Sequence, residues 1–227
     1  MNEHSMTQPG RLAAGALVLT LLAACGALER ADQPPPVFYA LDGTSPTGQG
    51  PVHAVAPPAA PTLLISTPQA APGFTSRRII YVRAPHQPEY FANNEWVDTP
   101  PRMLAPLLAP ALEGSGAFRA IVLAPSATAA ELRLDVSIVR LQHEFFSSPS
   151  QVRLTLRAYL VDNKTRQVLA WREFDETVAA PQDSPYGGVI AANAALRKVL
   201  DALAAFTVEA AAKRPATLTQ RLPPRLL

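Results

Sequence analysis

Alternation of apolar and polar residues is clearest in the second half of the chain. Apolar side chains from Leu132 to Ile138 alternate with polar ones, which is the period of a half-buried β-strand. The apolar phase then shifts to Val139 and Leu141. One extra residue in a β-bulge between Ile138 and Arg140 would account for that shift. We therefore predict a long strand with a bulge in its middle.

Two further strands follow the same period. The segment from Val152 to Leu160 alternates apolar with polar residues, so one of its faces should be buried. The segment from Gln167 to Thr177 carries Trp171 and Phe174, and the turn residues Asp162 to Thr165 separate the two. The pattern predicts a run of three antiparallel strands.

The last element is a long helix from Pro185 to Ala212. Its apolar residues recur at spacings of three and four and form one stripe: Val189, Ala192, Leu196, Val199, Leu203, Phe206 and Ala210. A coiled-coil seam would have the same spacing but also flanking charges in register, which are not present. A single face that packs on the sheet is the favoured interpretation.

Shorter elements precede these. Val37 to Leu41 and Arg78 to Arg83 have the composition of strands, as does the brief run from Leu63 to Ser66. The aromatic pair Tyr90-Phe91 and the segment Glu95 to Val97 bracket Asn93-Asn94. Because asparagine tolerates the left-handed backbone of a tight turn, this stretch predicts a small hairpin.

A second helix is expected after Asp98-Thr99-Pro100-Pro101, with a capping side chain followed by prolines in the first turn. Its leucines have helical spacing, and Gly114 or Gly116 should end it. Pro106 and Pro110 conflict with this pattern, since an interior proline costs about 3 kcal/mol. We therefore expect a helix that is kinked or that begins late. A strand from Phe118 to Leu123 follows, which makes a β-α-β crossover.

The predicted fold class is α/β, a single domain over residues 37–212. It has a mixed β-sheet with the crossover, the three-strand antiparallel run and the long C-terminal helix packed on the sheet. Residues 43–61 are rich in Gly, Pro and Ala without periodicity and predict a mobile loop. Residues 213–227 are Pro-rich and basic and predict a disordered tail.

The N-terminus has the pattern of an export signal. Arg11 precedes an apolar run from Leu12 to Leu22, which at roughly ten residues is too short to cross a membrane. Leu22-Ala23-Ala24-Cys25 then matches the bacterial lipobox, in which the chain is cut before a lipidated cysteine. Residues 1–24 are thus predicted to be a lipoprotein signal peptide. Residues 25–36, which end in three prolines, are predicted to be a stiff, lipid-anchored tether.

Cys25 is the only cysteine in the 227 residues, so no internal disulfide can form. A chance cysteine after an ordinary signal peptide is the alternative, but it would leave a lone exposed thiol in an exported protein. Lipidation of Cys25 with two or more acyl chains would hold the protein on the membrane. The next residue is Gly26 and not the aspartate that retains lipoproteins in the inner membrane. We expect attachment to the outer membrane, facing the periplasm of a Gram-negative cell envelope.

Charge and motifs limit the chemistry. Lysine and arginine total 20 against 18 aspartate and glutamate, which gives a net charge of +2, and the basic residues are scattered along the chain. Both observations argue against nucleic acid as a partner. His143-Glu144 at a strand end predicts a surface pair, and Asp175-Glu176 should point to opposite faces of a strand. Ser184 to Gly188 is expected to be a plain helix-start loop, with anion binding as the weaker alternative. We expect no catalytic residues, no metal site and no cofactor.

From Val37 to about Ala211 the chain resembles the ABC-type transport auxiliary lipoprotein family, which includes lipoproteins of the paraquat-inducible protein C type. The resemblance is carried by Phe38-Tyr39-Ala40-Leu41, by Arg78-Ile79-Ile80-Tyr81 and by a central block. In that block an aromatic residue, Tyr90, is followed by Trp96, by Pro100-Pro101 and by Leu104 and Leu107-Leu108. The interrupted helix and the basic tail depart from the family pattern.

The resemblance implies an α/β sandwich and a lipoprotein component of an ABC transport system that moves phospholipids or other lipids between membranes. Its implied partners are a protein with mammalian-cell-entry domains, a permease and an ATPase. The domain would position that partner at the outer membrane. Alternatives are that the domain binds lipid in an apolar pocket near Tyr90 to Trp96, or that it is an envelope assembly or regulatory lipoprotein. A homo-oligomer is also possible.

Four aromatic side chains are the candidates for contact with a partner or with lipid: Tyr81, Tyr90, Phe91 and Trp96. Aromatic side chains dominate the energetics of protein interfaces, so an exposed group of them would indicate a binding surface. Packing in the core is the alternative for each, and it is the favoured one for Tyr81 and Trp96.

Overall fold

The computed structural model describes residues 35–43, 57 and 59–214 of the chain. The predicted signal peptide, Cys25, nearly all of the tether and most of the 43–61 loop therefore lie outside the described residues. So does the predicted tail beyond Arg214. The following paragraphs concern the described residues.

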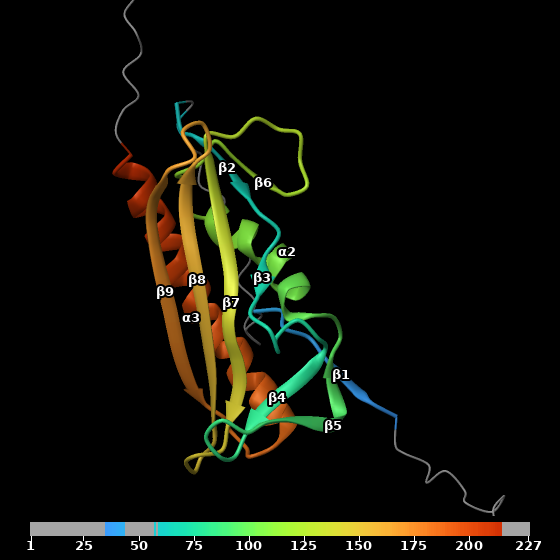
Figure 1. The fold of residues 1–227 in the computed structure, drawn as a ribbon. Coiled ribbons are helices and arrows are strands. Elements are labelled where there is room, and N and C mark those ends of the chain that lie inside the picture. The colour runs from blue at the N-terminus through green and yellow to red at the C-terminus, as the bar shows by residue number, and fades with distance from the viewer. Residues whose placement is uncertain (1–34, 44–56, 58, 215–227) are drawn as a thin grey trace, which may run out of the picture. The chain divides into compact units, whose positions relative to one another are not determined.

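Three long strands dominate the fold, as the alternation predicted (Figure 1). They are β7 (Leu132–Glu144), β8 (Gln151–Asp162) and β9 (Val168–Ala179), and each is antiparallel to the next. The register of β7 against β8 shifts between Ile138 and Arg140, so the predicted bulge is confirmed. Beyond the bulge, Leu141 and His143 take the buried side, and Arg140, Gln142 and Glu144 take the other.

The other edge of β7 pairs with three short strands in succession, all parallel to it. They are β2 (Thr62–Ile65), β3 (Gln69–Ala70) and β4 (Arg78–Val82). Outside β2 lies β6 (Ala120–Leu123); outside β4 lie β5 (Pro88–Trp96) and then β1 (Val37–Tyr39). The nine strands of the described chain thus form one mixed sheet, as expected for the fold class.

The predicted hairpin around Asn93-Asn94 is wrong. The chain continues through both asparagines as one strand, β5, which is antiparallel to β4. The register of this pair jumps between Arg78 and Ile80, which leaves three extra residues on β5 between the partners Tyr90 and Glu95. The asparagines lie within that irregular stretch, so they bend the strand without reversing it.

Helix α2 (Pro100–Glu113) begins at its first proline, so the expectation of a late start is wrong. Pro106 and Pro110 are both inside the helix and both exposed. Because they are four residues apart, they lie on the same solvent-facing side, where water can solvate the carbonyl groups that lose a donor. Thr99 is the N-cap but its side chain makes no capping hydrogen bond.

The crossover is present in a modified form. Strands β4 and β6 run in the same direction as β7, and α2 lies in the connection between them after β5. Gly114 and Gly116 follow the end of α2, and Gly116 adopts a positive φ of 62°, consistent with the predicted stop.

Helix α3 (Pro185–Ala212) has the predicted bounds, and every residue of the predicted stripe is buried. It packs on β7, β8 and β9, against alternate side chains such as Leu154, Leu156 and Leu160. Figure 1 shows both helices behind the sheet. We call this the covered face, and the opposite side of the strands the open face, on which no helix of the described chain packs.

Asn193 of α3 fastens the N-terminal end of the domain to the helix. Its side-chain amide donates to the carbonyl of Ala40 (3.1 Å) and accepts from the backbone amides of Asp42 (2.9 Å) and Gly43 (3.0 Å). Leu41 between them is buried in the core. The segment that follows β1 is therefore part of the packed domain.

Candidate functional site

Arginine–carboxylate pairs cover much of the open face. They join Arg133 Nε to Asp135 Oδ1 (2.9 Å), Arg153 Nε to Asp175 Oδ1 (2.9 Å) and Arg157 Nε to Glu173 Oε2 (3.1 Å). Alternation in β7, β8 and β9 places these side chains opposite the buried leucines. The Arg153 guanidinium, with the Thr155 hydroxyl as a second donor, lowers the pKa of Asp175 to about 2 despite partial burial. These charges satisfy one another within the sheet.

The same face is hollowed at the end of β7 into a groove of about 440 Å³, which we call the open groove. Ile80 and Val82 of β4 form an apolar part of its lining, and Tyr90 and Phe146 add aromatic surface. Both aromatic side chains are exposed, Tyr90 to 41%. The groove is open to solvent, and Tyr90 is the predicted contact residue that it holds.

Arg140 lines the open groove from the bulge of β7. Its side chain is partly buried, yet within the described chain its guanidinium makes no ion pair or hydrogen bond. Arg78 is similar: its guanidinium carbon lies 4.9 Å from the centre of the Tyr90 ring but it has no carboxylate partner among the described residues. Of these two arginines only Arg140 lines the groove, and Arg78 is next to it through the Tyr90 ring.

Tyr81 and Phe91 lie on the covered face and not in the groove. Their ring centres are 4.4 Å apart, and Phe145 stands edge-on to Tyr81 at 5.9 Å. The Tyr81 hydroxyl donates to Glu89 Oε2 (2.9 Å), and this bond raises the pKa of Tyr81. Arg83 pairs with the same carboxylate and lowers the pKa of Glu89. Both rings are partly buried in this cluster.

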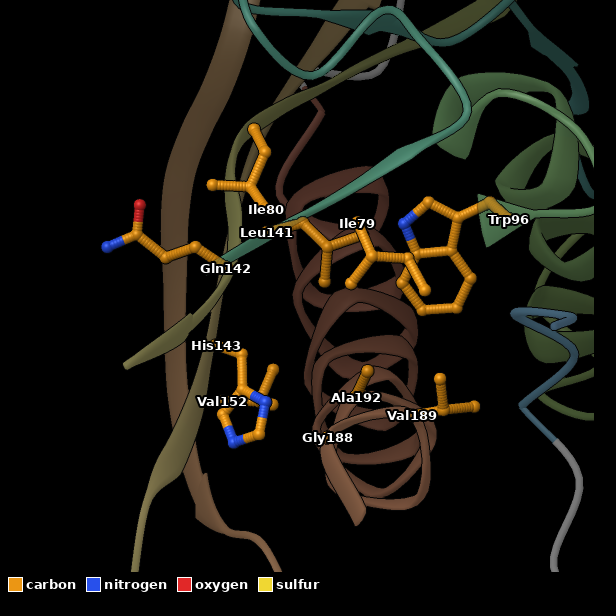
Figure 2. Close-up of a pocket in the computed structure, with 10 residues that line it drawn as sticks. All are labelled: Ile79, Ile80, Trp96, Leu141, Gln142, His143, Val152, Gly188, Val189 and Ala192. Carbon is orange, nitrogen blue, oxygen red and sulfur yellow. The ribbon is translucent and has the colours of Figure 1, made fainter. Parts of the chain in front are cut away.

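Trp96 is 3% exposed and belongs to the hydrophobic core. It lines a small cavity together with Ile79, Val189 and Ala192 (Figure 2). The volume of this cavity is about 10 Å³, which is room for about one water molecule. The structure therefore places the Trp96 side chain in the core, which is the alternative that the sequence favoured.

His143 borders the same cavity, and the prediction of a surface pair with Glu144 is wrong. The imidazole is only 2% exposed and lies against Val152 and the first turns of α3 (Figure 2). After the bulge, residue 143 falls in phase with the buried positions and Glu144 with the open face. Burial lowers the pKa of His143, and the negative charge of Asp183 opposes that shift only in part.

The contacts of His143 are close on both sides. Nε2 lies 2.7 Å from the Ser150 hydroxyl, whereas Nδ1 has no hydrogen-bond partner among the described residues. A methyl group added at Gly188 of α3 would stand 2.5 Å from Nδ1. Glycine at this position therefore permits the helix to approach the ring.

His143, Ser150 and Asp183 have the residue types of a catalytic triad but not its arrangement. Asp183 Oδ1 accepts from the backbone amide of Ser150 (2.8 Å) and does not orient the imidazole. Ser150 and His143 are both buried, and the adjoining cavity admits no substrate. The geometry fits a buried polar contact that joins the β7–β8 loop to the start of α3.

Two smaller predictions concern Asp175-Glu176 and the start of α3. Asp175 and Glu176 do point to opposite faces, since Asp175 pairs with Arg153 and Glu176 lies 3.8 Å from Lys198 of α3. Ser184 caps α3 by accepting from the amide of Gly187 (3.1 Å). Within the described ranges, no three His, Cys, Asp or Glu side chains are grouped to hold a metal ion.

Of the four aromatic candidates, the structure thus brings only Tyr90 to the open groove. Arg140 and Phe146 are groove residues that the sequence reasoning missed. The signal for Arg140 was available in the phase shift at Ile138, because a bulge turns Arg140 toward the open face. Phe146 follows the strand in a loop, where alternation gives no information.

Among the described helices none is long and apolar enough to span a membrane. The fold itself has solved counterparts. Protein XCC0632 from Xanthomonas campestris, a DUF330 protein, is 21% identical, with a TM-score of 0.62 over 77% of this chain and 96% of its own. A crystal structure of a protein without a described function is 14% identical, with a TM-score of 0.58 over 76% and 99%. At these identities the likeness shows a shared fold.

The family follows from the sequence match. The model of the ABC-type transport auxiliary lipoprotein component matches residues 39–204, which is most of the folded domain, and the chain belongs to this family. No curated protein matches the chain. The members of this family are described as auxiliary components of transport systems, and the family is not one of enzymes. The chain is accordingly a lipoprotein of a transport-associated family, and membership indicates anchoring in the cell envelope.

Proposed function

We propose that this protein is a non-catalytic component of an ABC transport system, anchored to the outer membrane through lipid on Cys25. It docks the periplasmic part of the transporter, a protein with mammalian-cell-entry domains served by a permease and an ATPase. The system moves phospholipid between the membranes. The family match over residues 39–204 carries this proposal, because it covers the domain that would make the contact.

The shapes of the cavities favour docking over lipid carriage. A lipid carrier must enclose an acyl chain, whereas the cavity beside Trp96 and His143 has a volume of only about 10 Å³. The open groove is larger, but it is exposed to solvent and lined by charged as well as apolar residues. An open surface with exposed aromatic side chains is typical of a protein contact.

The arrangement of His143, Ser150 and Asp183 supports a non-catalytic role, although their residue types are those of a catalytic triad. Ser150 and His143 are buried, and Asp183 bonds to the backbone amide of Ser150, so the set has neither access nor orientation for nucleophilic attack. Anchoring is supported by Leu22-Ala23-Ala24-Cys25, and outer-membrane sorting by Gly26 in place of aspartate.

Site-specific photo-crosslinking in cells tests the docking role. A photoreactive phenylalanine analogue replaces Tyr90 in the open groove, and in a matched strain it replaces Trp171, which is 61% exposed toward the other end of the same face. We expect a crosslinked product containing a mammalian-cell-entry-domain protein from position 90 and much less from position 171. Absence of any transport component from both products would refute the proposal.

Replacement of the anchor tests location. Cys25→Ser should leave the domain folded but release it from the membrane fraction and abolish transport, measured as movement of radiolabelled phospholipid between membranes. Full transport by the released protein would show that the anchor is not required.

A further inference from the structure

We propose that the open groove binds an acidic segment of a partner polypeptide, in which a carboxylate lies next to an aromatic or branched apolar side chain. The inference rests on the proposed function for the identity of the partner, and it adds the chemistry by which the partner is recognised. Arg140 would receive the carboxylate, and the apolar side chain would lie on Ile80 and Val82.

The charge pattern of the open face favours a negatively charged ligand. Arg133, Arg153 and Arg157 on this face each have a carboxylate within hydrogen-bond distance. Arg140, which lines the groove, has none within the described chain, and neither has Arg78, which lies over the Tyr90 ring. A partly buried guanidinium without a counterion gains more from an incoming carboxylate than a paired one does, because no existing bond is broken.

Negative groups near Arg140 are already engaged. Glu144 lines the groove, but its Oε1 accepts from the Gln142 side-chain amide at 2.7 Å. Asp175 is close enough for Arg140 to help lower its pKa, yet its oxygens are bound by Arg153 and by Thr155. Glu144 keeps its negative charge, but neither it nor Asp175 forms an ion pair with Arg140 within the described chain, so the Arg140 guanidinium has its hydrogen-bond donors available to a ligand.

The shape of the groove favours a peptide over a lipid. Ile80 and Val82, which are only 5% and 6% exposed, form the floor of the groove, and the exposed rings of Tyr90 and Phe146 flank them as a short apolar surface. That surface suits one side chain and leaves the rest of the ligand in solvent, whereas an acyl chain needs an enclosed apolar channel. Arginine and aromatic side chains at one site are also the combination that dominates protein interfaces.

A second aromatic patch on the same face serves as a comparison. The rings of Tyr159 and Trp171 are stacked with their centres 6.2 Å apart, and the neighbouring Arg157 is paired with Glu173. On the open face this patch offers exposed aromatic surface beside an arginine that is already paired, and the adjacent Arg172 lies over the Phe206 ring. It should not select acidic segments, so it separates the effect of charge from that of aromatic exposure.

Selection from a random library of displayed heptapeptides provides the first test, with the full-length chain held in detergent micelles. We expect enriched sequences in which Asp or Glu is adjacent to an aromatic or branched apolar residue. The best acidic peptide is then labelled with fluorescein and titrated by anisotropy, beside the same peptide with Asn and Gln in place of its acids. We expect the neutral peptide to bind about tenfold more weakly, as for a lost charge-assisted hydrogen bond. Enrichment of neutral or basic sequences, or equal binding of the two peptides, would overturn the inference.

Substitutions place the peptide in the groove. Arg140→Gln should weaken the acidic peptide about tenfold and leave the neutral peptide unchanged, whereas Arg140→Lys should retain part of the difference. Arg157→Gln is the matched control and should change neither. Circular dichroism melting should show that Arg140→Gln changes the unfolding temperature little, since Arg140 makes no hydrogen bond or ion pair in the described chain and interacts with Asp175 only at a distance. A loss of affinity in the Arg157 variant equal to that in the Arg140 variant would assign the binding to general surface charge.

Competition identifies the source of the anion. Neither a molar excess of inorganic phosphate over peptide nor vesicles of phosphatidylglycerol should displace the acidic peptide. Displacement by either, with loss of that effect in Arg140→Gln, would assign the groove to phosphate and overturn the inference. If crosslinking from Tyr90 captures the transport partner while acidic peptides fail to bind, the docking role stands and this inference falls. If acidic peptides bind but no transport component is captured, this inference stands and the docking role falls.

Discussion

The two faces of strand β8 differ in how they contribute to the fold. Leu156 is fully buried between Ile138 and Phe174, whereas the next residue, Arg157, points to the open face and pairs with Glu173. Packing sets the stability of the covered face, and on the open face solvent screens the charges. Residues on the open face can therefore serve binding with little effect on folding. The unpaired Arg140 is the clearest example.

The largest expected effect is on the covered face. Leu156→Ala should lower the free energy of unfolding by about 2–5 kcal/mol, because it removes a buried side chain and leaves a cavity. Urea unfolding followed by circular dichroism measures this loss. The neighbouring Arg157→Ala is the matched variant, and its loss should be much smaller. Equal losses at the two positions would contradict the distinction between the faces.

Acid should weaken the covered face next, through His143. Burial lowers the pKa of this histidine in the folded state, so below about pH 6.5, its ordinary value, the unfolded chain binds more protons than the folded one. The stabilisation is complete above that pH and decreases as the pH falls toward the folded-state pKa. Urea unfolding at several pH values between 7.5 and 5 should show this slope.

His143→Gln should flatten that slope, since glutamine does not titrate. The matched variant His86→Gln replaces an exposed histidine in the β4–β5 turn and should retain the slope of the unmodified chain. A slope that persists unchanged in His143→Gln would show that another group controls the response to acid.

The smallest effect is expected on the open face, at Asp175. Its pKa is lowered to about 2, but the side chain is 36% exposed and solvent screens the pair. Asp175→Asn should therefore lower the free energy of unfolding by only about 1 kcal/mol near pH 7. That difference should be present above about pH 4 and disappear as the pH approaches 2, where the aspartate itself is neutralised. A difference that is independent of pH would assign the loss to something other than the charge.

Regular periodicity made much of the fold predictable. The three long strands, the bulge at Ile138 and the bounds of α3 follow from the spacing of apolar residues alone. The errors lie where local signals compete with tertiary structure. Asn93-Asn94 carries a turn signal, yet β1 pairs with Asn94 and β4 pairs with Tyr90 and Glu95 on either side of the asparagines, which keeps the chain in one strand. Pro106 is tolerated because it lies on the exposed side of α2.

The candidate site was less predictable than the fold. Tyr90 was foreseen as an aromatic contact, but its separation from Tyr81 and Phe91 depends on the faces to which β4 and β5 direct their side chains. His143 was misassigned because the bulge was not carried through to the following residues. The open groove joins the β3–β4 and β4–β5 loops to Phe146, and no spacing in the sequence brings these segments together.

The contact between Asn193 and the segment after β1 has a mechanical consequence. Any pull on the chain from its N-terminal side enters the domain at β1, which is only three residues long and pairs with β5 alone among the described strands. After β1, the side-chain amide of Asn193 is hydrogen-bonded to Ala40, Asp42 and Gly43. The force therefore passes next into α3 at Asn193. The longest helix of the domain would thus bear the load, and tension could separate β1 while the sheet and the open groove keep their shape.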